Sequence, residues 1–197
     1  MNSLPSKEIF RKSIHLFSST IPLGYYFIIT DRLLMIKILL LFSIVFIFID
    51  LARNKVLKIK YFFDNWFSIM LRDHESRGEI TGATWLVISS LITIIIFPRE
   101  IAVPAILFLT IGDAFAAIVG KIFPLGNIKG KTISGSISGL FMSLLVIIPI
   151  MDNINYKILI LGGFSAMAIE LLSIPIDDNF TIPIISGFTM FLGLQLI

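Results

Sequence analysis

Long apolar runs separated by short polar segments make up most of this sequence. A helix needs about 20 apolar residues to cross a bilayer, with a range of roughly 17–25. Lipid accommodates only helices or closed barrels, and no long alternation of apolar and polar positions indicates strands. The pattern therefore predicts an all-α, polytopic transmembrane helical bundle that forms a single domain over residues 1–197. Seven stretches are the expected spans, namely 14–30, 33–51, 83–98, 101–120, 135–151, 156–174 and 181–197.

Residues 52–82 form a long stretch that is not expected to cross the membrane. Aromatic residues such as Tyr61 and Trp66 are interspersed with charges there, which is typical of an amphipathic helix lying in the interface. The stretch ends in a polar run that contains Arg72 and Glu75. Two interpretations of that run stay open: a polar tail of the interfacial helix, or a gate for a lipid substrate.

The composition fits a membrane protein and excludes several other classes. Hydrophobic residues make up 56% of the chain and charged residues 15%, whereas soluble domains carry about 25% charged residues. No cysteine is present, which excludes disulfides, zinc–thiolate sites and thiol nucleophiles. The net charge of +3 is small, so we expect no nucleic-acid partner. The first residues lack the small-residue cleavage site of a signal peptide.

The distribution of lysine and arginine predicts the topology. With a cytoplasmic N-terminus, the cytoplasmic pieces are residues 1–13, 52–82, 121–134 and 175–180, and they hold 12 of the 16 basic residues. Cytoplasmic loops carry an excess of positive charge. We therefore expect a multi-pass protein whose polar motifs gather on the cytoplasmic face.

The stretch 110–139 places an acid inside apolar sequence. An acid at membrane depth is costly unless it faces a wet or paired interior, so Asp113 is a candidate functional residue. A loop rich in Gly, Ser, Thr and Lys follows it and leads into another apolar run. Free N–H groups and the helix dipole at such a helix start attract phosphate. The candidate phosphate-binding residues are Lys121, Lys129, Lys131, Thr132, Ser134, Gly135 and Ser136.

Part of this loop, GNIKGKT at 126–132, is one residue short of a Walker A motif. The motif needs glycine at position 125, where Leu125 stands, and a strand before it, where a span is expected. A P-loop fold is therefore excluded. The weaker prediction, that Lys129, Lys131 and the following helix start hold phosphate, is kept.

Four polar residues near the N-terminus share one helical stripe. Glu8, Arg11, Lys12 and His15 follow the i, i+3, i+4, i+7 spacing of a helix face. The stripe suits a positive belt beside the membrane, and it equally suits the binding of a polyphosphate.

Further acids occur near the end of the chain, at Glu170, Asp177 and Asp178, with Asn179 next to them. Residues 177–179 have the composition of a turn followed by a helix cap. If they lie beside Asp113 on the same face, the same oxygens also suit a Mg²⁺ site.

Taken in order, these motifs resemble the superfamily of polyprenol and dolichol kinases, phytol kinases and CTP-dependent diacylglycerol kinases. The likeness covers nearly the whole chain, and its combined spacing is more specific than any one motif. The residues that carry it are Glu8, Arg11, Lys12 and His15; Arg72, His74, Glu75, Thr81, Gly82 and Ala83; Gly112, Asp113, Ala114, Ala117, Gly120 and Lys121; Lys131, Thr132, Gly135 and Ser136; and Glu170, Asp177, Asp178, Asn179 and Pro183.

The resemblance implies an integral membrane enzyme that uses a nucleoside triphosphate, typically CTP, to phosphorylate the hydroxyl of a lipid alcohol. We expect Asp113, Asp177 and Asp178 to hold Mg²⁺, with Asn179 as a further ligand or a neighbour of the ligands. Lys131 and the amides near 134–136 would bind phosphate. The remaining expected roles are phosphate binding for Arg11 and Lys12, proton acceptance by His15 or one of the acids, and orientation of a cation or closure of the base network by Glu170.

The chain departs from that superfamily at Ser134, which stands where a glutamate is frequent. The same loop also looks like that of CDP-diglyceride synthetases (phosphatidate cytidylyltransferases). Their C-terminal signature is replaced here by IDDNFTIPIISG, which favours the kinases. A small membrane transporter without enzymatic activity is an alternative of another class, because intramembrane acids also serve as ion or proton sites.

Overall fold

A computed structural model describes residues 6–67, 71–172 and 174–196 of the chain. The regular elements of the described residues are helices, apart from two strands of two residues each that pair antiparallel in a small hairpin. The expected all-α class is confirmed, and the hairpin is an addition that the sequence did not predict. The elements are α1 (Ser6–Ser18), α2 (Thr20–Phe27), α3 (Arg32–Lys55), α4 (Leu57–Phe67), α5 (Asp73–Ser76), α6 (Gly82–Ile96), α7 (Arg99–Leu107), the π-helical segment η1 (Phe108–Gly112), α8 (Asp113–Ile122), β1 (Asn127–Ile128), β2 (Lys131–Thr132), α9 (Ile133–Ile150), α10 (Tyr156–Leu172) and α11 (Asp178–Leu196).

Several of these helices suit a membrane. Among the described residues, four helical segments are long and apolar enough to cross a bilayer, and α6 is apolar but shorter. The expected span at 14–30 is helical but divides at Ser19 into α1 and α2. Membrane-crossing helices are therefore confirmed by length and composition, whereas the number of seven spans stays a prediction. The four segments are Arg32–Lys55, Arg99–Ile122, Ile133–Ile150 and Asp178–Leu196.

Polar caps determine where three of the helices begin. Asp31, Thr81 and Thr132 each accept a hydrogen bond from a backbone N–H two or three residues further on, at the starts of α3, α6 and α9. In the polar stretch 52–82, α3 continues to Lys55, so the expected amphipathic helix is the shorter α4.

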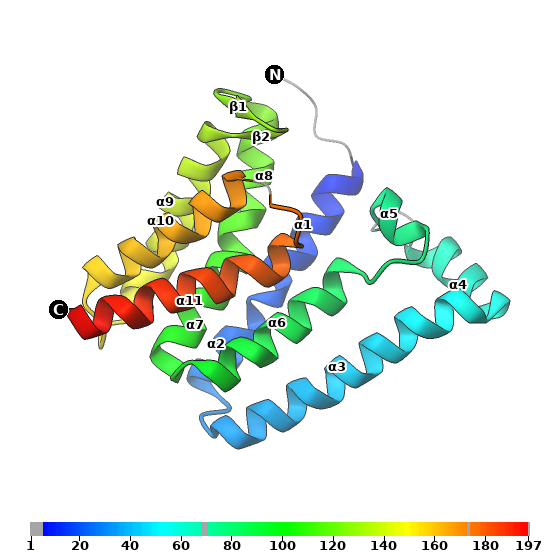
Figure 1. Cartoon of the computed structure of the whole chain (residues 1–197), viewed down its shortest axis with the longest axis horizontal. Coiled ribbons are helices and arrows are strands. Elements are labelled where there is room, and N and C mark those ends of the chain that lie inside the picture. Colours follow the sequence, from blue (N-terminus) through cyan, green and yellow to red (C-terminus); the bar gives the residue numbers. More distant parts are fainter. Residues whose placement is uncertain (1–5, 68–70, 173, 197) are drawn as a thin grey trace.

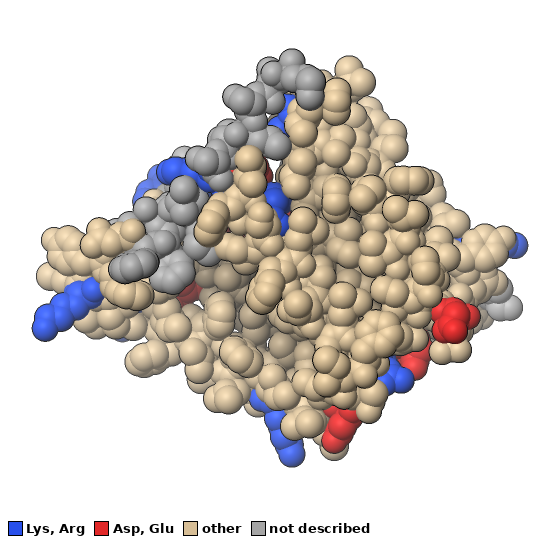
Figure 2. Space-filling view, turned by 180° about the vertical axis from the view of Figure 1, so that it is seen from behind, with Lys and Arg blue, Asp and Glu red and all other residues tan. Residues whose placement is uncertain are grey.

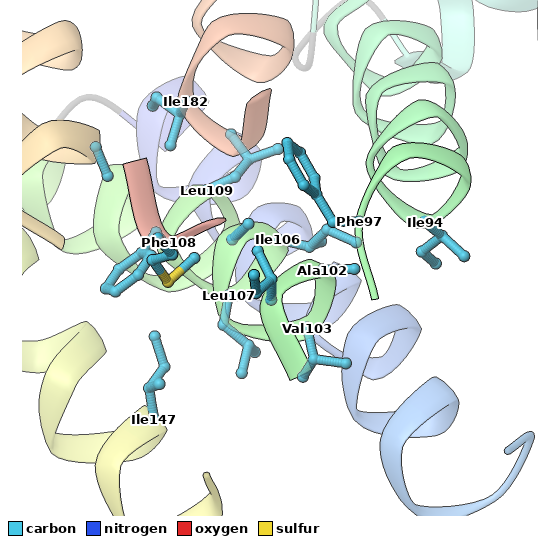
Figure 3. Packing of buried hydrophobic residues seen from close by; sticks show 14 of the residues in the cluster. Ile94, Phe97, Ala102, Val103, Ile106, Leu107, Phe108, Leu109, Ile147 and Ile182 are labelled. Atoms are coloured by element: carbon cyan, nitrogen blue, oxygen red, sulfur yellow. The ribbon is translucent and has the colours of Figure 1, made fainter. Parts of the chain in front are cut away.

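The centre of the molecule is the continuous helical segment formed by α7, η1 and α8. Every residue from Ile101 to Leu109 is buried. Figure 3 shows the side chains of this segment spreading toward Ile147 of α9, Ile182 of α11 and Phe97 at the end of α6. Burial of apolar surface on all sides makes this segment the scaffold on which the other helices pack.

The motif-bearing connections gather toward one end of the bundle. Figure 1 shows the hairpin, the start of α1 and α5 in its upper part, whereas the connections from α2 to α3 and from α6 to α7 lie at the bottom. The predicted gathering of the polar motifs on one side is thus present in the fold. Assignment of that side to the cytoplasm stays a prediction.

The outer surface is rich in exposed apolar side chains. Figure 2 shows a wide, mostly uncharged face, with charged residues gathered mainly toward its margins. A surface of this kind is typical of contact with lipid, because large apolar patches are rare on soluble monomers. Examples of large exposed apolar residues are Phe17, Phe48, Phe141, Phe164 and Leu192.

Candidate active site at one end of the helical bundle

Asp113 is the first residue of α8 and lies buried where α1 packs against this helix. Lys12 Nζ donates a hydrogen bond of 2.5 Å to its Oδ2 atom. His15 Nδ1 lies 3.2 Å from the same oxygen but makes no hydrogen bond to it. Because Lys12 and His15 are three positions apart, one face of α1 presents both. Asp113 therefore has the paired surroundings that an acid at this depth requires.

The same face of α1 carries Glu8 and Arg11. Glu8 pairs with Arg11 at 2.7 Å and with Lys121 of α8 at 3.0 Å. Burial alone would raise the pKa of Glu8, but the hydrogen bond from Lys121 and the charge of Arg11 hold it below its usual value. The N-terminal stripe is thus a polar seam between α1 and α8 and not a belt that faces outward.

Lys131, at the end of the hairpin, connects α10 to α11. Its Nζ lies 3.1 Å from Glu170 Oε1 and 2.5 Å from Asp178 Oδ2, and Ser136 Oγ donates to Glu170 Oε2 at 3.0 Å. Burial would lower the pKa of Lys131, but the two carboxylates outweigh burial and raise it, and Asp113 adds to the effect. Lys131 is therefore held as a cation within electrostatic reach of Asp113.

Arg72 brings the stretch before α6 into the same cluster. Its Nη1 donates to Asp177 Oδ2 at 2.9 Å, and its backbone N–H donates to Glu75 Oε2 at 2.9 Å. Glu75 Oε1 also accepts from the N–H of Gly82 at 2.8 Å. Burial opposes the charge of Arg72, yet the carboxylates of Asp177 and Glu75, followed by Asp113, raise its pKa. The two ends of the chain and the 72–82 segment thus meet around one group of charges.

The predicted phosphate loop is only partly drawn into this cluster. Lys129 occupies the exposed turn of the hairpin with a φ of 49°, and Lys121 contacts the cluster through Glu8 alone among the described ion pairs. Thr132 caps α9 by accepting from the N–H of Gly135, and Ser134 Oγ donates to the carbonyl of Phe123.

The prediction that the amides near 134–136 cradle an anion is not supported by this arrangement. The N–H groups of Ile133 and Ser134 donate to the carbonyls of Gly126 and Leu125, and that of Gly135 donates to Thr132. Two amides of the predicted stretch, those of Ser134 and Gly135, are therefore engaged in closing the loop onto the helix start, as is the neighbouring amide of Ile133. Lys131 is the residue of this loop that reaches the acids.

The carboxylates of the cluster suit Mg²⁺ in their chemistry. Among the described residues, no three His, Asp or Glu side chains are grouped to hold a metal ion, because the acids contact cations instead. Mg²⁺ usually takes one or two carboxylates and completes its shell with water and substrate phosphates. Asp113, Asp177 and Asp178 therefore offer the kind of oxygen that a Mg²⁺ ion arriving with a triphosphate needs, and the site itself stays a prediction.

A large apolar cavity reaches this cluster from the side. It has a volume of about 800 Å³ and lies between α1 and α2 on one side and α3 and α6 on the other. Among the residues that line it are Arg11, His15, Arg72, Glu75 and Asn179. The charged group thus closes one end of a space whose remaining wall is largely apolar.

The uncharacterized protein RP860 of Rickettsia prowazekii (strain Madrid E) is 30% identical to this chain over 182 residues, with 88% of each chain covered. The two proteins belong to one family. No family model matches the chain, and no solved structure matches it. Since the likeness to RP860 extends over most of both chains, it concerns the whole bundle and not a single motif.

Three polar residues of this member of the RP860 family were not assigned to the site from the sequence. Arg72 and Glu75 appeared in a stretch with two open interpretations and among the residues that carry the resemblance, but they received no role in the site. Asp50, near the end of α3, accepts hydrogen bonds from Thr81 and Thr84 at the start of α6. The available signal was the position of Asp50 at the end of an apolar run, close in the predicted topology to the 72–82 segment.

Proposed function

We propose that this protein is an integral membrane lipid-alcohol kinase. It transfers the terminal phosphoryl group of CTP, or of another nucleoside triphosphate, to the hydroxyl of an isoprenoid alcohol such as polyprenol, dolichol or phytol, or of diacylglycerol. The observation that carries the proposal is the meeting of a buried acid, Asp113, with several cations at the polar end of an apolar cavity. Such a site offers charge for phosphates and hydrocarbon surroundings for a lipid in one place.

The ion pairs indicate how a triphosphate is received. Lys131 is shared between Glu170 and Asp178, and Arg72 binds Asp177. Phosphate oxygens compete with carboxylates for these donors, and arginine contacts phosphate with two parallel hydrogen bonds. When phosphates bind Lys131 and Arg72, the carboxylates that these two cations had neutralised lose their partners, and their oxygens become free.

Those freed oxygens are the ligands a phosphate-bound metal needs. A bound Mg²⁺ neutralises charge on the transferring phosphoryl group. The residues that would hold it are Asp113, Asp177 and Asp178, with Asn179 as a neighbour of these ligands. Arg11 and Lys12, which lie on the same face of α1, bind other phosphates of the nucleotide.

Phosphoryl transfer depends mainly on positioning and charge neutralisation. The acceptor oxygen forms its bond to the terminal phosphorus while the bond from phosphorus to the bridging oxygen breaks, and the nucleoside diphosphate leaves. The hydroxyl proton passes to His15 or to one of the neighbouring acids. Glu170 keeps Lys131 aimed at the phosphates through its ion pair.

The test uses purified protein in detergent or nanodiscs, with Mg²⁺, a terminally labelled nucleotide and a lipid alcohol. CTP, UTP, ATP and GTP are each crossed with polyprenol, phytol and diacylglycerol. We expect labelled phosphate in the lipid product, and Asp113→Asn should lower the rate at least about 100-fold, as removal of one key electrostatic group does.

The matched control is Asp152→Asn, an exposed acid in the connection between α9 and α10. It should leave the rate unchanged, and the folded state of both variants is verified by gel filtration and melting. Full activity of Asp113→Asn would remove Asp113 from the proposed role. Release of pyrophosphate with formation of a CDP-lipid would replace the kinase by a cytidylyltransferase, and no turnover with any pair would favour a transporter.

A further inference from the structure

The cavity beside the charged cluster has a polar end and an apolar end. Its polar end is formed where α6 begins, near Glu75 and Asn179, and by His15 of α1. Its apolar end is formed by the facing surfaces of α2 and α3, at residues such as Met35 and Leu39. Hence the space runs along the helices, away from the charges, toward the opposite end of the bundle.

Polar groups along the middle of the wall are already satisfied. Asp50 Oδ2 accepts three hydrogen bonds from Thr81 and Thr84, and Ser18 Oγ donates to the carbonyl of Ile14. A ligand in the cavity therefore finds few polar partners along its length. Pockets of roughly 300–1,000 Å³ hold ligands of drug size, so the volume of about 800 Å³ suits one long chain.

At the polar end, three lining residues have buried polar atoms without a hydrogen-bond partner among the described residues: Arg11 at Nε, His15 at Nδ1 and Asn179 at both amide atoms. The side chain of Asn179 is 1% exposed. A buried amide without partners is costly, and it offers both a donor and an acceptor. A hydroxyl is the group that satisfies both at once.

The surroundings of Asn179 favour a neutral group. A Cβ atom at Gly82 would lie 2.9 Å from Asn179 Nδ2 and 3.4 Å from Glu75 Oε1, so the amide and the carboxylate are neighbours. Glu75 disfavours a second carboxylate beside Asn179, whereas a hydroxyl carries no charge to be repelled. The cations that also line this end, Arg11 and Arg72, are already paired with Glu8 and Asp177.

Building on the proposed kinase, we propose that this cavity binds the hydrocarbon of a single-chain lipid alcohol and that Asn179 holds its hydroxyl. The chain lies between α2 and α3, and the hydroxyl lies at the end near His15 and Asp113. Asn179 is thereby a substrate-binding residue for the acceptor.

Two positions allow the cavity to be filled without disturbing the core. Gly24 lines the cavity, and a Cβ atom there would meet nothing within 4 Å. Ala83 also lines it and is exposed. We expect Gly24→Leu and Ala83→Phe each to weaken the binding of tritiated phytol at least 10-fold, measured without nucleotide. The control Ile44→Phe adds bulk on an exposed part of α3 outside the cavity and should bind as wild type does.

The hydroxyl contact has its own readout. Asn179→Leu should weaken phytol binding about 10-fold, the loss expected for one hydrogen-bonded group. It should not weaken binding of the corresponding hydrocarbon that lacks the hydroxyl. Equal loss for both probes would overturn the role of Asn179, because it would indicate a general disturbance of the cavity.

The outcomes separate this inference from the proposed kinase. If phytol binds and Gly24→Leu blocks this binding, but no phosphoryl transfer occurs, the proposed lipid cavity stands and the proposed kinase activity is refuted. If phosphoryl transfer to phytol occurs and neither Gly24→Leu nor Ala83→Phe changes it, the proposed kinase activity stands and the role of the cavity is overturned. Binding of the matching fatty acid as tightly as phytol would overturn the assignment of the polar end to a hydroxyl.

Discussion

Lys12 Nζ lies 2.5 Å from Oδ2 of Asp113, and the two side chains are only 3% and 9% exposed. The residues are 101 positions apart in the chain. This contact ties α1 to the central helical segment and does so with a pair of charges in an apolar setting. Removal of one partner leaves the other charge buried, which is far more costly than removal of both.

A double-mutant cycle tests this pair. Lys12→Met should lower the free energy of unfolding by about 3–5 kcal/mol, the loss typical of a broken buried ion pair. The double variant Lys12→Met/Asp113→Leu should be more stable than Lys12→Met alone. Reversible unfolding in mixed detergent micelles, followed by circular dichroism, measures both. Additive losses in the double variant would show that the two charges do not depend on each other.

Lys131 should make stability sensitive to alkaline pH. Its folded-state pKa is raised above the ordinary 10.5 because Glu170 and Asp178 outweigh burial. A raised pKa contributes stability that is complete below the ordinary value and is lost as pH rises through the folded value. The difference in melting temperature between wild type and Lys131→Gln should therefore be constant from pH 7 to about 10 and shrink above about 10.5.

Lys131→Arg provides the matched comparison, since arginine stays charged over this range. The melting temperature of Lys131→Arg should stay above that of Lys131→Gln at the pH where the difference between wild type and Lys131→Gln declines. The exposed Lys157 serves as the control position, because Lys157→Gln should follow wild type throughout. A difference that is unchanged or larger at high pH would contradict the ion pairing of Lys131.

Asp50 should stabilise the contact between α3 and α6. Its Oδ2 accepts from the N–H of Thr81 at 2.9 Å, from Thr81 Oγ1 at 3.1 Å and from Thr84 Oγ1 at 2.7 Å. Asp50→Ala leaves these buried donors without a partner and should cost about 2–4 kcal/mol. Thr84→Val removes one donor and should cost about 1 kcal/mol. Thermal melting compares both with Asp152→Ala, and a neutral Asp50→Ala would refute this role.

The large features of the fold were predictable because they depend on the lengths of apolar runs. Each expected span contains helix, and the polar motifs lie toward one end of the bundle. The prediction that most depended on geometry was that Asp113 and residues 177–179 share one place. Arg72 pairs with Asp177 and Lys131 with Asp178, and Asp113 contributes to the raised pKa of both cations. That these acids share one metal–triphosphate complex stays a prediction.

The individual partners were not predictable, because they depend on how each helix is rotated and how closely it packs. Nothing in the sequence tells whether Lys131 faces Glu170, Asp178 or solvent. The π-helical segment just before Asp113 also shifts the helix face, a local change that an ideal helical repeat does not contain. Nor does the sequence tell that the N–H groups of Ser134 and Gly135 bond locally, to Leu125 and Thr132.

The close approach of α8 and α9 supports the last prediction. A Cβ atom at Gly135 would collide with the carbonyl oxygen of Ala116, a backbone atom that cannot swing aside. Gly135→Ala should therefore destabilise the protein by about 1–3 kcal/mol, as overpacking does. At Gly193 the same Cβ would make an ordinary contact of 3.4 Å with Leu161.

Gly193→Ala is thus the matched control, and its expected effect on stability has the opposite sign. Alanine in a helix without a clash stabilises by about 0.4–1 kcal/mol because it restricts the unfolded chain. The melting temperature should fall for Gly135→Ala and rise for Gly193→Ala. Since Thr132 and Lys131 precede this contact, a forced separation of α8 and α9 would also displace Lys131 from Asp178. An equal rise in melting temperature for both variants would contradict the close packing of α8 and α9. It would also contradict the position of the hairpin over the acids, because that position depends on this packing.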